Sequence, residues 1–81
     1  MYRGKCVDAS NQDINQGETD LGQMSKEECL AKCKEGSLVI ATGCEYHATD
    51  QNCTMHSSQE IDSGDNVENY FCAIFTGKSF N

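Results

Sequence analysis

The segment SKEECLAKCKEG, residues 25–36, predicts a short helix whose two ends are marked in the sequence. Ser25 is a favourable N-cap residue, and Glu28 three positions later completes a capping box. Gly36 is the residue type that ends many helices in a left-handed conformation. We therefore expect a helix that starts after Ser25 and stops at Gly36.

One face of this helix is directed inward. Cys29, Leu30 and Cys33 share a single stripe at helical spacing. The charged residues that face away from this stripe are Lys26, Glu27, Lys32 and Lys34. The two sulfurs, one turn apart, could serve as metal ligands, as a redox pair, or as anchors to another element.

Length and cysteine content favour anchors. A chain of 81 residues buries only about 60% of its unfolded surface, so its core alone gives marginal stability. Six cysteines in so short a chain predict a disulfide framework, although sequence alone permits about 15 pairings. Disulfides persist in oxidising compartments, which predicts a secreted or extracellular protein.

The charge of the chain argues against polyanion partners. Acidic residues number 13 against 6 basic ones, and the net charge is −7. Nucleic acid or heparin binding requires clustered lysine and arginine, so we expect neither partner. No segment approaches the ~20 apolar residues of a membrane span.

The start of the chain, MYRGKCVDAS, has no apolar run of the signal-peptide type. We expect residues 1–81 to form a single domain. Either Met1 is an added start, or the domain is excised from a longer secreted protein.

The remaining segments predict a small antiparallel sheet. Residues 1–7 alternate in polarity like a short strand, and 38–41 form an apolar strand or buried extended piece. Residues 43–48 and 52–57 predict the two strands of a hairpin, with its turn at residues 49–51. The apolar run 70–75 predicts a central strand covered on both faces. The polar segments 8–23 and 58–69 predict surface loops. The fold class is therefore α+β, with one helix packed on a disulfide-stapled sheet.

The hairpin presents two different faces. Alternation places Cys44, Tyr46, Cys53 and Met55 on one face, and Glu45, His47, Thr54 and His56 on the other. Packing the helix on the sulfur-bearing face lets Cys29 and Cys33 each reach a different hairpin strand. Two pairings of helix with hairpin satisfy this geometry. Cys6 and Cys72 then remain, in the first and last strands.

The cysteine order, with Cys29-x3-Cys33 on a helix and two cysteines on a hairpin, resembles the PAN/apple family. The stretch GCEYHATDQNCTMHS followed by NYFCAIF is similar to the core of that fold. The resemblance covers nearly the whole chain. It implies a nested disulfide pattern, namely Cys6 with Cys72, Cys29 with Cys53, and Cys33 with Cys44. It also implies binding to proteins or carbohydrates.

Other uses of the cysteines fit less well. Structural zinc sites use two close pairs of ligands, whereas Cys44 and Cys53 lie nine positions apart. Redox centres favour C-x-x-C, a spacing that the chain lacks. We expect no metal centre and no cofactor.

Several polar residues are candidates for ligand binding. They lie on the outer hairpin face and its turn: Glu45, His47, Asp50, Asn52, Thr54 and His56. The register that pairs His47 with Asn52, Glu45 with Thr54 and Gly43 with His56 separates the two imidazoles by roughly 13 Å, too far for one ion. We therefore interpret both histidines as independent surface residues.

Two further motifs have simpler readings. Segment 62–69 offers the oxygen ligands Asp62, Asp65, Asn66 and Glu68, but without the spacing of a calcium-binding hand, which favours a solvated loop. Asn52-Cys53-Thr54 matches a glycosylation sequon, although Asn52 also suits a turn.

The aromatic residues could stack on a sugar ring, but most are needed for the core of a chain without tryptophan. Those assigned to the core are Tyr46, Tyr70, Phe71 and Phe75. Tyr2 and Phe80, near the termini, are not assigned to the core and are freer to contact a ligand.

No nucleophile, base and orienting group occur together, so we expect no enzyme. The sequence predicts a non-catalytic extracellular recognition module that binds a protein or carbohydrate, with a protein favoured. The alternative is a free-standing secreted effector, such as a toxin or inhibitor, which would require an exposed reactive loop.

Overall fold

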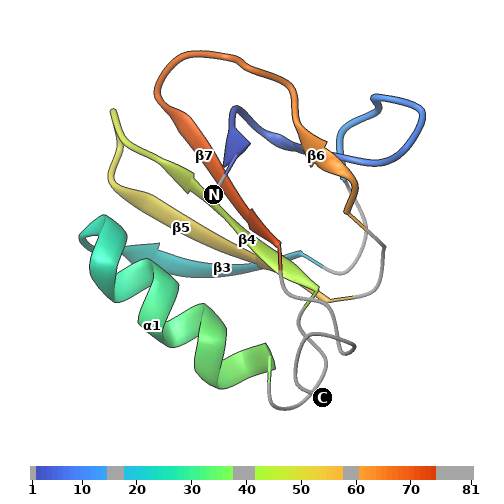
Figure 1. Cartoon of the computed structure of the whole chain (residues 1–81). Helices are drawn as coiled ribbons and strands as arrows, with labels where there is room; N and C mark the ends of the chain where they lie inside the picture. Colours follow the sequence, from blue (N-terminus) through green and yellow to red (C-terminus); the bar gives the residue numbers. More distant parts are fainter. Residues whose placement is uncertain (1, 15–17, 38–41, 58–60, 75–81) are drawn as a thin grey trace.

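The computed structural model describes residues 2–14, 18–37, 42–57 and 61–74. These form an α+β domain in which one helix packs on an antiparallel sheet (Figure 1). The helix, α1 (Lys26–Ser37), covers β4 and β5. A small second sheet lies against the opposite face of the large one, where the disulfide from Cys6 to Cys72 joins them. Among the described residues, no helix is long and apolar enough to cross a membrane.

The large sheet has five strands in the order β1-β7-β4-β5-β3, all antiparallel. Their bounds are β1 Tyr2–Arg3, β7 Tyr70–Ile74, β4 Gly43–His47, β5 Asn52–His56 and β3 Glu18–Gln23. The second sheet pairs β2 (Cys6–Val7) with β6 (Ser63–Gly64). The predicted interior position of the last strand is confirmed, although the middle strand of the five is β4.

The N-terminus of α1 has the predicted capping box. The Glu28 N–H donates to Ser25 Oγ over 3.2 Å, and the Ser25 N–H donates to Glu28 Oε1 over 3.3 Å. The predicted stop at Gly36 is wrong, because the helix continues through Ser37. The entry to the helix is also tied to the hairpin, since Tyr46 Oη donates to the Met24 carbonyl over 2.8 Å.

The β4–β5 hairpin has the predicted register. Gly43 pairs with His56, Glu45 with Thr54, and His47 with Asn52. Because directly paired residues share a face, the intervening Cys44, Tyr46, Cys53 and Met55 all point toward α1. The two-faced hairpin is therefore confirmed.

The first segment forms two short strands rather than one. β1 pairs with β7 in the large sheet, and β2 pairs with β6 in the small one. The chain changes sheets at Gly4, whose φ of 105° belongs to the left-handed region that glycine tolerates. A Cβ at Gly4 would also collide with the backbone of Asp65 and Asn66. Cys6 therefore lies in the second sheet, and its disulfide to Cys72 bridges the two sheets.

The prediction of an unbroken loop over residues 8–23 is wrong, because β3 lies within it. β3 is an edge strand that pairs only with β5, and most of its residues are exposed. Its register shifts between Asp20 and Gly22, where Gly22 adopts a φ of 93°. Only Leu21 packs against the helix-side core, so the strand carries little of the apolar alternation that marks a buried one.

The polar segment 58–69 likewise contains a strand, the two-residue β6. Its backbone supports β1 and β2, since the Asp62 N–H donates to the Val7 carbonyl and the Asn66 N–H to that of Arg3. Residues 38–41 and Phe75 lie outside the described residues, so the strand predicted at 38–41 is not addressed.

Two cores lie on opposite faces of the large sheet. The helix-side core contains Cys29, Cys33, Cys44, Tyr46 and Cys53. The core under the second sheet contains Cys6, Ile14, Ile61 and Cys72. Three disulfides join Cys6 to Cys72, Cys29 to Cys53, and Cys33 to Cys44. These are the pairs that the family resemblance implies, and two of them fasten α1 to the hairpin.

Replacing Ser25 with alanine removes the acceptor for the Glu28 N–H and should lower the free energy of unfolding by about 1 kcal/mol. Urea denaturation measures the change. Ser10→Ala, at an exposed serine outside the helix, is the control and should change stability far less.

The long-range disulfide should contribute more stability than the short-range one. Loop-closure entropy gives about 4 kcal/mol for Cys6–Cys72, with sequence separation 66, and about 3 kcal/mol for Cys33–Cys44, with separation 11. The double variants C6A/C72A and C33A/C44A each exchange two buried cysteines for alanine, so their cavity costs are matched. A larger loss for C33A/C44A in urea denaturation would contradict this account.

Candidate functional site

The face of the large sheet opposite α1 is covered by the second sheet at one end, and is polar and open at the other. The open end lies next to the β4–β5 turn, and we name its residues the turn patch. The turn patch consists of His47, Asp50, Asn52, Thr54, Asp20 and Gln23. All six are exposed or half-buried. Four of them are predicted site residues, which the register brings together.

Asp20 and Gln23 are members of the turn patch that the sequence did not identify. They come from β3, in which Asp20 pairs with Thr54 and Gln23 with Asn52. Gln23 Nε2 also donates to the Asp50 carbonyl over 3.2 Å. The only sequence signal was the alternation within ETDLGQ, which is too polar to stand out from a loop.

His47 is the most strongly fixed side chain of the turn patch. Its Nδ1 lies 2.9 Å from Asp50 Oδ2. Its ring stacks on Tyr70, with centroids 4.1 Å apart and planes 5° from parallel. The Lys5 ammonium lies 5.0 Å from the centroid of the same Tyr70 ring. The imidazole is therefore oriented by Tyr70 on β7 and by Asp50 in the hairpin turn.

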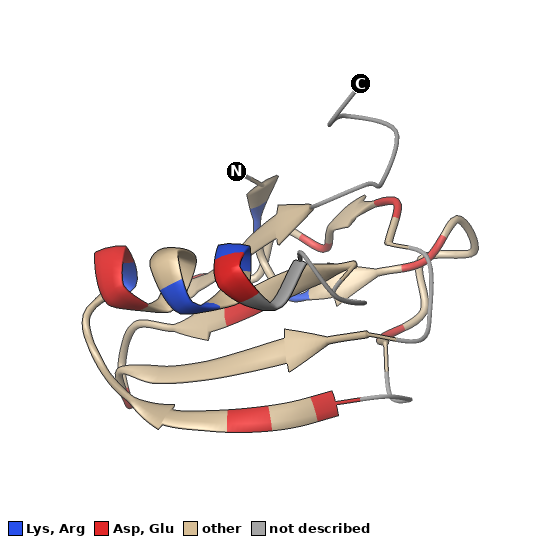
Figure 2. Cartoon of the chain, turned by 90° about the horizontal axis from the view of Figure 1, so that it is seen from below, with Lys and Arg blue, Asp and Glu red and all other residues tan. Residues whose placement is uncertain are grey.

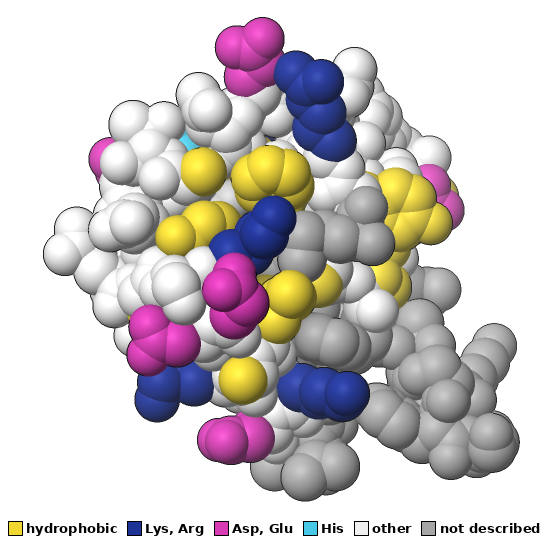
Figure 3. Space-filling model, turned by 60° about the vertical axis from the view of Figure 1, so that its left-hand side comes forward, with side chains coloured by type: hydrophobic (Ala, Val, Ile, Leu, Met, Phe, Trp, Pro, Cys, Tyr) yellow, Lys and Arg dark blue, Asp and Glu magenta, His cyan; other side chains and the backbone are white. Residues whose placement is uncertain are grey.

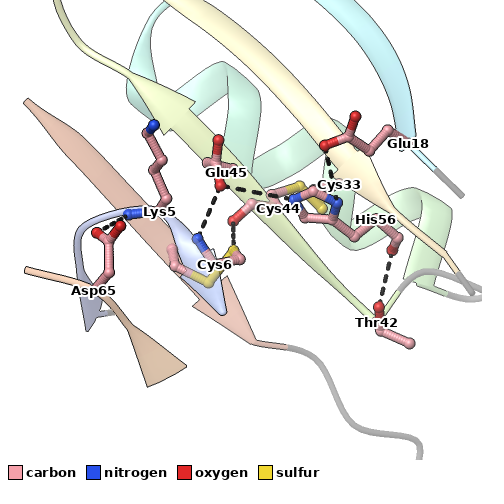
Figure 4. Close-up of a disulfide and its surroundings, with 10 residues drawn as sticks. Lys5, Cys6, Glu18, Cys33, Thr42, Cys44, Glu45, His56 and Asp65 are labelled. Atoms are coloured by element: carbon pink, nitrogen blue, oxygen red, sulfur yellow. Dashed lines mark hydrogen bonds and ion pairs between the residues drawn. A yellow bond between two sulfur atoms is a disulfide. The ribbon is translucent and has the colours of Figure 1, made fainter. Parts of the chain in front are cut away.

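The opposite end of this face is covered by the second sheet. Glu45 is only 20% exposed there, and its Oε1 accepts a hydrogen bond from the Cys6 N–H over 2.8 Å (Figure 4). His56 is completely buried, so the prediction that it is a surface residue is wrong. The alternation correctly placed both side chains away from α1, but it could not reveal that Cys6 of β2 lies against them.

The buried imidazole of His56 has an unusual environment. Neither ring nitrogen has a hydrogen-bond partner. Nδ1 lies 3.9 Å from Glu18 Oε1, and Nε2 lies 3.8 Å from Glu45 Oε1. Figure 4 shows the ring between these two carboxylates, which come from β3 and β4.

Two clusters of the described residues have the spacing of metal ligands. One comprises Cys29, Cys44 and Cys53, and the other Cys6, Glu45 and His56. Every cysteine in them belongs to a disulfide, so none can supply a thiolate. The first cluster then has no ligand left, and the second has one nitrogen and one carboxylate.

The acidic segment 62–69 is engaged in structural contacts. Asp65 Oδ1 accepts hydrogen bonds from the N–H groups of Lys5 and Val67, over 2.8 and 3.0 Å. Glu68 lies 3.7 Å from Arg3 in an exposed ion pair. These carboxylates support the crossover from β1 to β2.

The aromatic residues predicted for the core divide into two groups. Tyr46 is buried, whereas Tyr70 and Phe71 are half-buried. Phe71 packs against the helix-side core with the Lys26 ammonium 4.6 Å from its ring centroid. Figure 2 shows basic and acidic residues along α1, and Figure 3 shows hydrophobic side chains gathered beside charged ones on one face of the molecule. Tyr2 is exposed, and Phe75 and Phe80 lie outside the described residues.

The sequon asparagine lies on β5, paired with His47 on one side and Gln23 on the other. Asn52 is therefore a strand residue within the turn patch, and not the turn residue suggested by its sequence context.

Comparisons with protein-family models, with curated proteins and with solved structures give no match to this chain. The resemblance to the PAN/apple family consequently stays a prediction.

Removing the Tyr70 ring should release His47. A stacked aromatic pair contributes about 1 kcal/mol beyond area burial, so Tyr70→Leu should lower stability by about that amount. The His47 ring protons should also move downfield in the NMR spectrum, because they lose the ring current of Tyr70. Tyr2→Leu, at an exposed tyrosine on neighbouring β1, should leave them in place. Unchanged His47 shifts in Tyr70→Leu would contradict the stacked arrangement.

Proposed function

We propose that the domain is a non-catalytic extracellular recognition module whose turn patch binds a protein partner. The observation that carries this proposal is the group of accessible polar side chains on three adjacent strands at the open end of the sheet. Three disulfides in a domain of this size are typical of extracellular proteins, which supports the proposed location.

The turn patch is rigidly supported. Cys53 lies between Asn52 and Thr54 in the chain, and its side chain points toward α1. There it forms a disulfide with Cys29. Cys44, on the other hairpin strand, is bonded to Cys33. Side chains held on a covalently fixed hairpin lose little conformational freedom on binding, and this preorganisation favours affinity.

The chemistry of the turn patch favours a protein over a glycan. Sugar binding commonly uses an aromatic ring exposed for stacking, but the nearest ring, Tyr70, already stacks on His47. Asp20 and Asp50 are exposed carboxylates, and the chain carries a net charge of −7. A partner with basic side chains would complement this surface and associate faster at low salt.

The absence of catalysis is part of the proposal. Asp50 orients His47 in the way that an acid orients a catalytic base. The residues that flank His47 on the sheet are Asn52 and Tyr70, neither of which is an activated nucleophile of the serine or cysteine type. The Asp50–His47 pair is better explained as a fixed hydrogen-bonding group for recognition.

The proposal can be tested with the oxidised, unglycosylated domain, immobilised for capture from an extracellular extract and screened in parallel on a glycan array. A captured protein should bind the variant D20N/N52A at least tenfold more weakly than the wild type. Glu27→Gln makes the same charge change on the exposed side of α1 and should alter the affinity less than twofold.

Each outcome of this experiment is informative. Binding that D20N/N52A and Glu27→Gln weaken equally would place the interface elsewhere and overturn the proposal. Glycan hits without a protein partner would replace the protein with a carbohydrate ligand. Retained thermal stability in D20N/N52A would show that the loss of affinity reflects the turn patch and not unfolding.

A further inference from the structure

His56 is the one buried polar side chain of the described core, and the turn patch does not include it. Its two ring nitrogens lack hydrogen-bond partners, yet each faces a glutamate oxygen at 3.8 to 3.9 Å. An N–H···O hydrogen bond has a length of about 2.7–3.2 Å, so both separations are less than ~1 Å too long. A small movement of the side chains would therefore allow both hydrogen bonds to form.

A neutral imidazole cannot satisfy both glutamates. It carries one N–H donor and one acceptor nitrogen, and an ionised carboxylate only accepts. One nitrogen must therefore face a carboxylate with its lone pair. A protonated imidazole has two donors, which match the two carboxylates in number and direction.

We propose that His56 is a proton-operated clamp that fastens the edge strand β3 to the centre of the sheet. When His56 takes up a proton, Nδ1–H donates to Glu18 and Nε2–H to Glu45, and β3 is held more firmly. Histidine is the side chain that changes charge between pH 5 and 8, so the clamp closes as a compartment acidifies.

The groups around His56 are consistent with this assignment. Glu18 comes from β3 and Glu45 from β4, the two strands that pair with β5. From the second sheet, Cys6 presents a disulfide, which does not titrate, and its N–H already holds Glu45. The next acidic group on the same face of β3 is Asp20, and the charged residues of α1 lie on the opposite face.

The two glutamates differ in a way that makes β3 the moving part. Glu45 is 20% exposed and fixed by the Cys6 N–H, whereas the Glu18 side chain is 47% exposed and lies on an edge strand. Closing the clamp shortens both separations, and we expect Glu18 and its edge strand to move further than Glu45. A buried charge needs paired partners of opposite charge, and the two carboxylates are placed to be those partners.

This inference does not rest on the proposed function, because it concerns the attachment of β3 and not a ligand. Its test uses NMR of the oxidised domain between pH 8.0 and 5.5, a range in which glutamate carboxylates ordinarily stay ionised. Histidine ring shifts report protonation, and His47→Gln identifies which of the two rings is His56. Amide exchange at Thr19, Asp20 and Leu21 reports the attachment of β3.

The expected result is that the β3 protection factors rise about tenfold on acidification, with the same midpoint as the His56 ring shifts. Glu18→Gln removes one arm of the clamp and should abolish most of the rise. Asp20→Asn removes the same charge from the same strand face two residues along, and should keep the rise.

Three results would overturn the inference. The His56 ring could keep its neutral shifts down to pH 5.5, Glu18→Gln could retain the tenfold rise, or Asp20→Asn could lose it equally. His56→Gln should also lose the rise. Because that buried position tolerates change poorly, the exposed Glu18→Gln variant carries the test if His56→Gln fails to fold.

Discussion

The structure depends on the covalent attachment of one helix to one hairpin. Cys29 and Cys33 lie one turn apart on α1, and they reach β5 and β4 respectively through two disulfides. This attachment fixes the hairpin register against the helix, because a slip of one residue would turn both sulfurs to the wrong face. It also determines which hairpin residues point away from α1, and thereby which residues can form a binding surface.

The parts of the fold that follow from short-range patterns could be predicted. The capping box of α1 and the pairing of Glu45 with Thr54 depend on residues close in sequence, with strong and specific signals. β3 and β6 could not be predicted, because an exposed edge strand and a two-residue strand need little apolar alternation. Their pairing is determined by backbone hydrogen bonds to distant segments. The pattern of side chains along the sequence carries little information about such bonds.

The candidate site was predictable to the same degree. Alternation assigned His47, Asn52 and Thr54 to one face, and the structure places them there. It could not show that the second sheet covers the far end of that face, since this depends on the chain crossing between sheets at Gly4. Burial of His56 is the consequence, so residues that are equivalent by pattern differ completely in exposure.

The polar side chains at the two ends of the hairpin differ in their effect on the stability of the domain. At the open end, polar side chains cost nothing to expose. At the covered end, a buried imidazole without hydrogen bonds costs about 1–3 kcal/mol, a large fraction of the stability of a small domain. An apolar residue would pack there without that cost. The disulfide between Cys6 and Cys72 closes the same covered end, and its contribution is large enough to offset the penalty. A polar group kept at such a cost, between two carboxylates from different strands, is better explained by a role for its charge than by packing.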